Sequence, residues 1–534
     1  MQKPIYTLDL ETDPFKYGRT PRPFAAGFYT GSEYYDTWGK NCVDRILEKV
    51  YEAPAGIVYM HNGGRFDLFM MLECIDVEKP MLIVNNRIVS AKVKCRDGWH
   101  DFRDSYKILP FPLSAMEKDV IDYRKMEAKV RNKHKYEIKK YLKKDCTALH
   151  EWVCMFLDRF GDHTTIGGCA IKQLKSFHET GEILSKEWDA HIRGKYYMGG
   201  RVQCFKKGIH KGDVKVFDVN SMYPFVMKTF KHPIGWPSTL GNEITDKTFF
   251  LSVEGYNRGA FPVRTKNCGI VFDVDYGIFN VTIHEYKAAV RLGMFDLVKV
   301  HETIDFDEWT SFDLFVDHFY ESRKIAISDG DKAGSMFYKL MLNNAYGRFA
   351  INPENYKDYR FSFDGEILKV CDCGRDRSPD CVGWHLAQVD TERNIMLWEK
   401  PAMFSKLSNV GTGASITGAA RSVLMEAIHN SVNPYYCDTD CVICEELPGV
   451  EQDVANLGAW KLEKEGNSIA IYGRKGYAIF DGGKCIKAAS KGVRITPEEI
   501  VLAARGEIIL YEQDAPSFTL TGAAKFISRK VRMT

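Results

Sequence analysis

The chain contains 534 residues, of which 45% are hydrophobic and 27% are charged, and these values are typical of a folded protein with two to four domains. Its 73 basic and 71 acidic residues leave a net charge of +2, so a polyanionic partner would have to be bound by local patches. Fifteen cysteines, no signal peptide and no apolar run of about 18 residues argue against a secreted or membrane-spanning protein, and we expect free thiols in a reducing cytoplasm.

The first part of the chain alternates strand-like runs with turns and then becomes helical. The strand-like runs are residues 4–13, 25–38, 56–67 and 81–105. Helical periodicity follows through residues 135–160. This pattern predicts a mixed α/β domain. We place its boundary at residues 165–190 and assign residues 1–175 to the first domain and 176–534 to the second.

Acidic residues lie in or after several of these elements. Asp9 and Glu11 stand at i and i+2 of the first strand, Asp67 follows a Gly-rich turn, and Asp145 lies one helical turn after Tyr141. Two Mg²⁺ ions about 4 Å apart require several carboxylate oxygens from separate elements. The pattern therefore predicts a two-metal phosphodiesterase site, in which Tyr141 would position the attacking water.

The second part of the chain begins with a strand-rich unit in which Asp218 ends an apolar strand. Residues 311–327 and 335–350 are predicted to form a helical hairpin, and residues 411–431 a further helix. Residues 352–405 between them look irregular and turn-rich.

Two polar patterns in this part have two readings each. Asp438 and Asp440 share one face of a strand, either as the acidic tip of a surface hairpin or as ligands of a divalent cation. Lys339, Asn343 and Tyr346 share one helix face, which is either a structural stripe or a surface for phosphate and a base pair.

In order, the N-terminal motifs resemble the three 3′–5′ proofreading exonuclease motifs of family B DNA polymerases, DxE, Nx2-3(F/Y)D and YxxxD. They stand here as residues 9–11, 62–67 and 141–145. The resemblance implies that Asp9, Glu11, Asp67 and Asp145 bind metal and act with Tyr141 in catalysis. It also implies single-stranded DNA contacts and an assisting lysine, namely Asn62, Phe66, Ser105 and Phe111, and Lys118.

The second part carries the polymerase motifs of the same family. Residues 218–224 match DxxSLYP with Met222 in place of leucine, and residues 438–441 match DTDS with Cys441 in place of serine. The resemblance implies that Asp218 and Asp440 hold two metal ions with Asp438 beside them. The helix at residues 335–350 resembles KxxxNSxYG.

Substrate contacts are implied by the same resemblance. Tyr223 looks like the steric gate that rejects a ribose 2′-hydroxyl, and Arg323 stands with the triphosphate contacts. The nucleotide-binding residues implied are Ser221, Met222, Tyr223, Lys324, Lys339, Asn343 and Tyr346. The primer-template residues implied, in the YxGG, Thr/Arg and KxY motifs, are Tyr197, Gly199, Gly200, Thr417, Arg421, Lys475 and Tyr477.

Length and motif order are similar to those of the protein-primed branch of phages, viruses and linear plasmids. This resemblance implies a ribonuclease H-like exonuclease domain followed by a right-hand polymerase. Within the polymerase it implies palm insertions at about residues 230–305 and 352–405, fingers at about 311–350 and a thumb at about 490–534.

The implied cofactor is Mg²⁺, two ions per site, with Mn²⁺ able to substitute. The implied partners are DNA primer-template, deoxynucleoside triphosphates and a terminal priming protein, for a monomer in the host cytoplasm without a membrane. Two alternatives remain open, a stand-alone 3′–5′ exonuclease and a non-catalytic DNA-binding relative.

One cluster lies outside these motifs. Cys371, Cys373, Cys381 and His385 fall within fifteen residues, and three thiolates with an imidazole would suit tetrahedral Zn²⁺. The alternative is a turn with reduced thiols.

Overall fold

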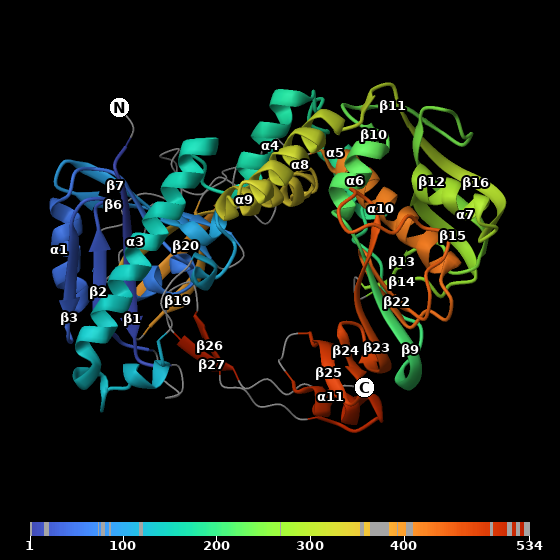
Figure 1. Ribbon diagram of the computed structural model, residues 1–534. Helices are drawn as coiled ribbons and strands as arrows, with labels where there is room; N and C mark the ends of the chain where they lie inside the picture. Colours follow the sequence, from blue (N-terminus) through green and yellow to red (C-terminus); the bar gives the residue numbers. More distant parts are fainter. Residues whose placement is uncertain are drawn as a thin grey trace. The chain divides into compact units, whose positions relative to one another are not determined.

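The computed structural model is of mixed α/β content and consists of two units (Figure 1). The first unit contains Met1–Cys169, Asn352–Ser405 and Gln513–Arg529, and the second contains Ala170–Ile351, Lys406–Glu512 and Lys530–Thr534. The structure describes residues 3–14, 21–72, 74–75, 81–84, 87–116, 121–266, 269–352, 357–363, 384–391, 394–401, 409–491, 495–509, 515–518 and 524–527.

The first unit is built on a ten-stranded sheet of order β19-β20-β18-β5-β6-β7-β4-β1-β2-β3. Its strand β1 pairs antiparallel with β2 and parallel with β4. The strands are β1 (Ile5–Thr12), β2 (Pro23–Tyr29), β3 (Tyr34–Trp38), β4 (Ile57–Met60), β5 (Met81–Ile83), β6 (Ile88–Cys95), β7 (Gly98–Asp104), β18 (Lys357–Phe363), β19 (His385–Asp390) and β20 (Ile395–Pro401). Its helices are α1 (Cys42–Glu52), α2 (Asp67–Met71) and α3 (Lys135–Phe160).

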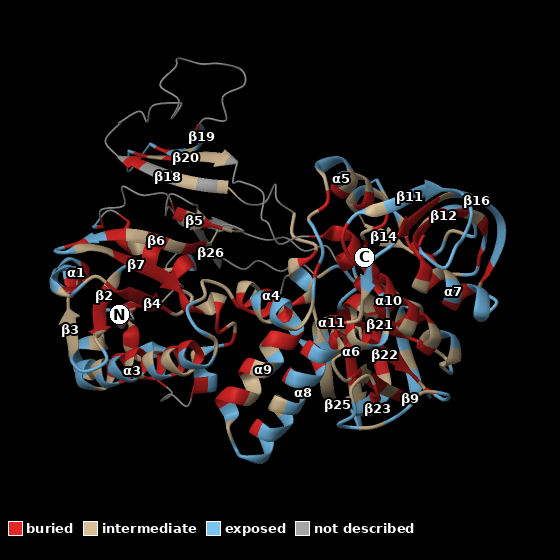
Figure 2. Ribbon diagram, turned by 90° about the horizontal axis from the view of Figure 1, so that it is seen from above, coloured by how far each residue is buried: buried red, intermediate tan, exposed pale blue. Residues whose placement is uncertain are grey.

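Helices α1 and α3 pack on opposite faces of the sheet because successive strand side chains point to opposite sides. Leu8 and Leu10 belong to a core cluster with Ile46 of α1. The other face carries Asp9 and Glu11, and there α3 contributes the core residues Tyr141, Leu142 and Cys146. Figure 2 shows buried residues in its inner strands, such as β2, β4 and β7, whereas the edge strand β3 is of intermediate exposure.

Residues 352–405 are less irregular than the sequence suggests. Strand β18 pairs antiparallel with β20 and with β5, so that Tyr359 lies opposite Met81. This pairing adds three strands to the sheet of the first unit. The expectation of an irregular segment was wrong for the described part, since strand pairing over such a distance leaves no local signal. Cys371, Cys373 and Cys381 lie outside the described residues, and His385 begins β19 exposed.

The second unit contains a seven-stranded sheet of order β25-β24-β23-β9-β22-β21-β8 and a four-stranded sheet of order β11-β16-β12-β15. The first sheet is formed by β8 (Val202–Cys204), β9 (Gly208–Val219), β21 (Tyr436–Asp438), β22 (Cys441–Cys444), β23 (Trp460–Gly473), β24 (Gly476–Asp481) and β25 (Lys484–Ala489). The second is formed by β11 (Pro237–Gly241), β12 (Thr248–Asn257), β15 (Tyr276–Thr282) and β16 (Phe295–Phe306).

Short strands complete the β-structure in three pairs. They are β10 (His232–Pro233) with β17 (Trp309–Thr310), β13 (Val263–Arg264) with β14 (Ile270–Val271), and β26 (Ala515–Phe518) with β27 (Ala524–Ile527).

The helices of the second unit include the hairpin predicted near residues 311–350, present as α8 and α9. Helix α10 is buried along most of its length. The helices are α5 (Lys186–Lys195), α6 (Met222–Thr229), α7 (Ile283–Arg291), α8 (Asp313–Ser328), α9 (Lys332–Asn344), α10 (Val410–Asn430) and α11 (Pro497–Ala504), and α4 (Ile166–Phe177) spans the division between the units.

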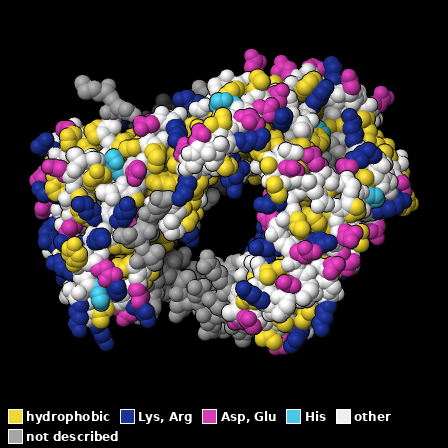
Figure 3. All heavy atoms as spheres, in the orientation of Figure 1, with side chains coloured by type: hydrophobic (Ala, Val, Ile, Leu, Met, Phe, Trp, Pro, Cys, Tyr) yellow, Lys and Arg dark blue, Asp and Glu magenta, His cyan; other side chains and the backbone are white. Residues whose placement is uncertain are grey.

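The surface agrees with the balanced composition. On the face drawn in Figure 3, basic and acidic side chains are interspersed. Among the described helices, none combines the length and the apolar character that a membrane span requires.

Candidate functional site

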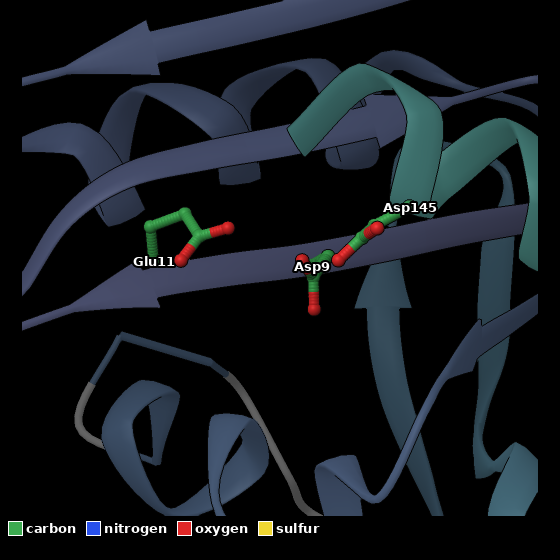
Figure 4. A group of neighbouring side chains, drawn as sticks. All are labelled: Asp9, Glu11 and Asp145. Atoms are coloured by element: carbon green, nitrogen blue, oxygen red, sulfur yellow. The ribbon is translucent and has the colours of Figure 1, made fainter. Parts of the chain in front are cut away.

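Three carboxylates of the first unit form one group. Asp9 and Glu11 project from β1 and Asp145 from α3, and one oxygen of each lies within 4.8 Å of the others (Figure 4). Glu11 and Asp145 are buried and Asp9 is partly buried. Carboxylate oxygens held this close repel one another, and hard oxygen ligands of this kind suit Mg²⁺. The donor set therefore fits a divalent cation.

The position of α3 over this face depends on a ladder of side chains from β3. On a strand, every second side chain points to the same face, and on a helix every fourth one does, and both intervals are about 6 to 7 Å. Successive side chains on one face of β3 can therefore each contact a side chain of α3. The pairs are Lys143 Nζ at 5.6 Å from the ring of Tyr34, Lys139 in an ion pair with Asp36, and Lys135 Nζ at 5.5 Å from the ring of Trp38. This ladder sets the register in which α3 presents Tyr141 and Asp145.

Asp67 does not belong to the group of three. It is the first residue of α2, is buried, and accepts a hydrogen bond from the backbone N–H of Leu10. Burial and the nearby charge of Asp104 raise its pKa to about 7. Its charge nevertheless acts on the same cysteine as the charges of the three grouped carboxylates. Burial raises the pKa of the Cys146 thiol most, and this pKa is raised further by the charges of Asp9, Asp145, Glu11 and Asp67.

The tyrosine of the third motif lies beside Asp145. Burial and then the charge of Asp145 raise the pKa of Tyr141, so its hydroxyl is a proton donor at neutral pH. Tyr141 Oη also lies 3.5 Å from Tyr123 Oη. A phenol in this position can orient a water molecule by hydrogen bonding.

The expected single-strand contacts of the first unit lie in two settings. Asn62 and Phe66 are partly exposed, and Asn62 has a left-handed backbone with φ of 60°. Ser105 is fully buried and donates to the carbonyl of Met60 at 3.1 Å, so the structure uses its hydroxyl internally. Phe111 packs on Trp152 with ring centres 5.4 Å apart. Lys118 lies outside the described residues.

The second acidic site lies where β9 and β22 meet. Cys441 pairs with Asp218 across the strands, and the N–H of Val219 donates to the carbonyl of Asp440 at 2.8 Å. The two aspartates therefore lie close together. Burial and then the charge of Asp440 raise the pKa of Asp218 to about 7, and burial also raises the pKa of Asp440. A divalent cation would relieve this repulsion.

Asp438, the third acid of this site, already has partners. Lys475 Nζ lies 2.9 Å from one of its oxygens, and Tyr436 Oη donates to the same oxygen at 3.3 Å. Its charge is thus compensated by a side chain.

The YMGG segment supports the turn between β21 and β22. A Cβ atom on Gly200 would lie 2.7 Å from Thr439 Oγ1, so only glycine allows the approach. Thr439 has a φ of 59°, and its N–H donates to the carbonyl of Arg201 at 2.8 Å. These contacts position Asp440 at the end of the turn.

A cavity of about 640 Å³ opens beside Asp218 and Asp440. It gathers the predicted nucleotide-binding residues, which lie in α6, α8 and α9, just before α6 or just after α9, and which are Ser221, Met222, Tyr223, Lys324, Lys339, Asn343 and Tyr346. Tyr223 and Tyr346 stack with ring centres 3.8 Å apart and planes inclined by 13°. Arg323 also lines the cavity. Its Nε atom is buried and has no hydrogen-bond partner among the described residues.

Two predicted primer-template residues lie in the interior. Thr417 and Arg421 are each 3% exposed. Arg421 Nε lies 2.6 Å from Glu285 Oε1, and its Nη1 donates to the carbonyl of Gly199 at 2.9 Å. Arg421 thus forms an ion pair with Glu285 and holds the YMGG segment from the interior, and its contact with the primer-template stays a prediction.

The KxY motif presents one exposed and one buried side chain. Lys475 is half exposed, has a φ of 54°, and its N–H donates to Tyr436 Oη at 3.0 Å. Tyr477 is buried against Tyr436, with ring centres 5.2 Å apart. Tyr197 precedes Gly199 and is partly buried.

Sequence reasoning missed two charged residues that line the cavity. Lys461 and Glu463 stand two residues apart on β23, and both line the cavity beside Asp218. Lys461 pairs with Asp218 in the strand register, and Glu463 forms an ion pair with Lys487 at 2.8 Å. Their i and i+2 spacing was the available signal, but it is common in surface strands.

Comparison with known proteins identifies relatives of this chain. A family model described as DNA polymerase type B, organellar and viral, matches residues 114–375. The DNA-directed DNA polymerase of Enterobacteria phage PRD1 is 41% identical over 99% of this chain and 98% of its own length. The DNA polymerase of Bacillus phage phi29 is 25% identical over 67% of this chain and 64% of its own length.

Solved structures of phi29 DNA polymerase show the same fold. One of them has a TM-score of 0.74 and 19% sequence identity, with 100% of both chains covered. Others were solved with primer-template DNA and with incoming nucleotide substrates.

Proposed function

The chain belongs to the organellar and viral type B DNA polymerases, and we propose that it is a DNA-directed DNA polymerase with a second, 3′–5′ exonuclease site. The observation that carries the polymerase assignment is the cavity in which two adjacent aspartates face cationic side chains from α8 and α9. Such an arrangement fits a nucleoside triphosphate with its metal ions.

In the polymerase site, Asp218 and Asp440 would hold Mg²⁺, for which Mn²⁺ can substitute. Two bound ions would stabilise the attacking and leaving oxygens of an in-line phosphoryl transfer. Arg323, Lys324 and Lys339 would neutralise and orient the triphosphate. Tyr223, held flat by Tyr346, would lie under the sugar and exclude a 2′-hydroxyl.

In the exonuclease site, Asp9, Glu11 and Asp145 would hold the cation, with Asp67 as a fourth acid. The hydroxyl of Tyr141 would orient the attacking water, and Lys118 would assist as the family resemblance implies. The remaining motif residues, from Asn62 to Phe111, would guide the single strand. For Ser105 this guidance would be indirect, through the backbone of Met60 that its hydroxyl holds.

These sites suggest a division of labour. We propose that the first unit is a ribonuclease H-like exonuclease domain and that the second contains palm, fingers and thumb, with α8 and α9 as fingers. The partners would be primer-template DNA, deoxynucleoside triphosphates and, because length and motif order resemble the protein-primed branch, a terminal protein whose hydroxyl starts synthesis. We propose that a monomer acts in the host cytoplasm.

One assay tests this proposal against its alternatives. The protein is given a single primed template with labelled 3′ and 5′ ends, with and without deoxynucleotides. We expect extension when nucleotides are present and 3′-end degradation when they are absent. Degradation alone would indicate a stand-alone exonuclease, and DNA binding without either reaction would indicate a non-catalytic relative.

A further inference from the structure

A tyrosine outside every motif reaches toward the carboxylates of the first unit. Tyr34 lies on β3, on the face that carries Asp9. Between them lies β2, where Gly27 pairs with Asp9 on one side and with Asp36 on the other. Tyr34 is thus two strands away from Asp9, and its long side chain spans the gap.

Gly27 makes this reach possible. A Cβ atom at this position would lie 2.8 Å from Tyr34 Oη, 3.0 Å from Leu142 Cγ and 3.2 Å from Cys146 Sγ. The tyrosine hydroxyl therefore lies over the bare backbone of Gly27, opposite Asp9 and beneath α3. Any larger residue at position 27 would push it away.

The hydroxyl of Tyr34 is buried and, among the residues that the structure describes, meets no hydrogen-bond partner. A buried polar group left in this state costs about 1 to 3 kcal/mol. Burial raises its pKa, and the charges of Cys146, Asp36, Asp9 and Glu11 raise it further. The group is therefore a neutral donor close to acceptors that carry negative charge.

Packing accounts for the ring of Tyr34 but not for its hydroxyl. The ring lies beneath Lys143 Nζ in the ladder between α3 and β3. A phenylalanine would make the same contact. The hydroxyl instead adds an unsatisfied group next to the acidic cluster, and a role at that cluster would explain its presence.

We propose that Tyr34 is a positioning residue of the carboxylate site, whose hydroxyl donates a hydrogen bond to the Asp9 carboxylate when a divalent cation is bound. Asp9 is favoured over Glu11 because it lies directly opposite Gly27. A donor behind a ligating carboxylate fixes its orientation and raises metal affinity. The inference rests on the proposed exonuclease function for the identity of the site.

The test compares Tyr34→Phe with Tyr35→Phe. Tyr35 is the neighbouring residue on β3, points to the other face, and donates its hydroxyl to Glu33 at the surface. Both variants are made in a chain that also carries Asp218→Ala and Asp440→Ala, so that binding at the other acidic site is removed. Mn²⁺ affinity is measured by the loss of the free-ion electron paramagnetic resonance signal, without DNA.

We expect Tyr34→Phe to weaken Mn²⁺ binding about tenfold and Tyr35→Phe to leave it unchanged. The melting temperature of Tyr34→Phe without metal should equal or exceed that of the parent, since an unsatisfied hydroxyl is removed. A purely structural role would instead lower the melting temperature and leave the affinity unchanged.

A second measurement uses single-turnover cleavage of single-stranded DNA over a range of Mn²⁺ concentrations. Tyr34→Phe should need more metal for half-maximal rate and should approach the parent rate at saturation. Equal Mn²⁺ affinity in Tyr34→Phe and its parent would overturn the proposal. If the parent binds Mn²⁺ but releases no nucleotides, the proposed exonuclease function fails, while the affinity comparison still decides the role of Tyr34.

Discussion

The acidic group on β1 and α3 and the aspartate pair at β9 and β22 both present carboxylates, but their neighbours differ. The first group is surrounded by a phenol, a thiol and a further carboxyl, from Tyr141, Cys146 and Asp67. Lysines on α3 that could offset its charge are engaged with β3 instead. Among the described neighbours of the group, positive charge is thus left to a bound metal ion.

The second site contains cationic side chains in addition to its acids. Arg323, Lys324, Lys339 and Lys461 line the same cavity as Asp218 and Asp440. Such a site can accept a highly charged triphosphate as well as metal ions. The difference teaches that carboxylates indicate where metal binds, whereas the surrounding cations indicate which substrate is bound.

The largest expected effect comes from removing acids of one site at a time. Asp440→Ala should reduce nucleotide incorporation about a thousandfold or more, because the metal ions provide several kcal/mol of transition-state stabilisation. Degradation of a 3′ end should continue at the parent rate. Both rates are measured on one primed template.

Asp145→Ala is the mirror control and should abolish degradation while incorporation continues. If Asp440→Ala removed both activities from a folded protein, the two sites would not be independent and the comparison would break down.

The next effect concerns the cations of the second site. Arg323→Gln should raise the KM for deoxynucleoside triphosphates by about 10 to 100-fold, because a charged hydrogen bond to phosphate contributes roughly 1.5 to 3 kcal/mol. Steady-state incorporation kinetics measure this. Arg258→Gln, which removes an exposed ion pair with Asp296, should change the KM little. An unchanged KM for Arg323→Gln would show that this arginine of the cavity does not bind the triphosphate.

The sugar-selecting tyrosine provides a finer test of the second site. Tyr223→Val should raise ribonucleotide insertion relative to deoxyribonucleotide insertion by about tenfold, because the ring that occupies the space of a 2′-hydroxyl is removed. Competition between the two nucleotides on one template gives the ratio. Tyr276→Phe, at an exposed position of the four-stranded sheet, is the control, and an unchanged ratio in Tyr223→Val would refute the gate.

Much of this arrangement can be predicted from local pattern. Asp9 and Glu11 stand two apart in β1, so their shared face follows from the period of a strand. The same expectation for Asp438 and Asp440 was wrong, because β21 ends at Asp438 and Asp440 lies in the turn before β22. The helical hairpin bearing Lys339 does follow from its apolar spacing.

Burial by distant partners could not be predicted. The family resemblance places Arg421 at the primer-template, but nothing near it in the sequence indicates its ion pair with Glu285, which lies 136 residues away. Strand β18 pairs with β5 across more than 270 positions, and no periodicity encodes that choice. Tyr34 carries no motif, and only the missing side chain at Gly27 shows where it points.

The smallest expected effect is a pH dependence of stability in the second unit. His232 is fully buried beneath α10, and its ring nitrogens contact Ser415 Oγ at 3.0 Å and the carbonyl of Val226 at 2.9 Å. Burial, and then the neighbouring His284, lower the pKa of His232 to about 3. Because the folded chain keeps this ring neutral while an unfolded chain protonates it near pH 6.5, its contribution to stability is complete above pH 6.5. The contribution is lost as pH falls toward 3 and amounts to about 2 kcal/mol at pH 5.

Urea unfolding of the second unit at pH 7.5 and pH 5 measures this loss, and His232→Gln should make the difference between the two pH values smaller by about 2 kcal/mol. His429→Gln, at the exposed end of α10, is the control and should leave the difference as it is in the parent. An identical pH dependence in His232→Gln and the parent would mean that the ring is protonated in the folded chain. Its hydrogen bond with Ser415 would then have to reverse direction, since a protonated imidazole can only donate.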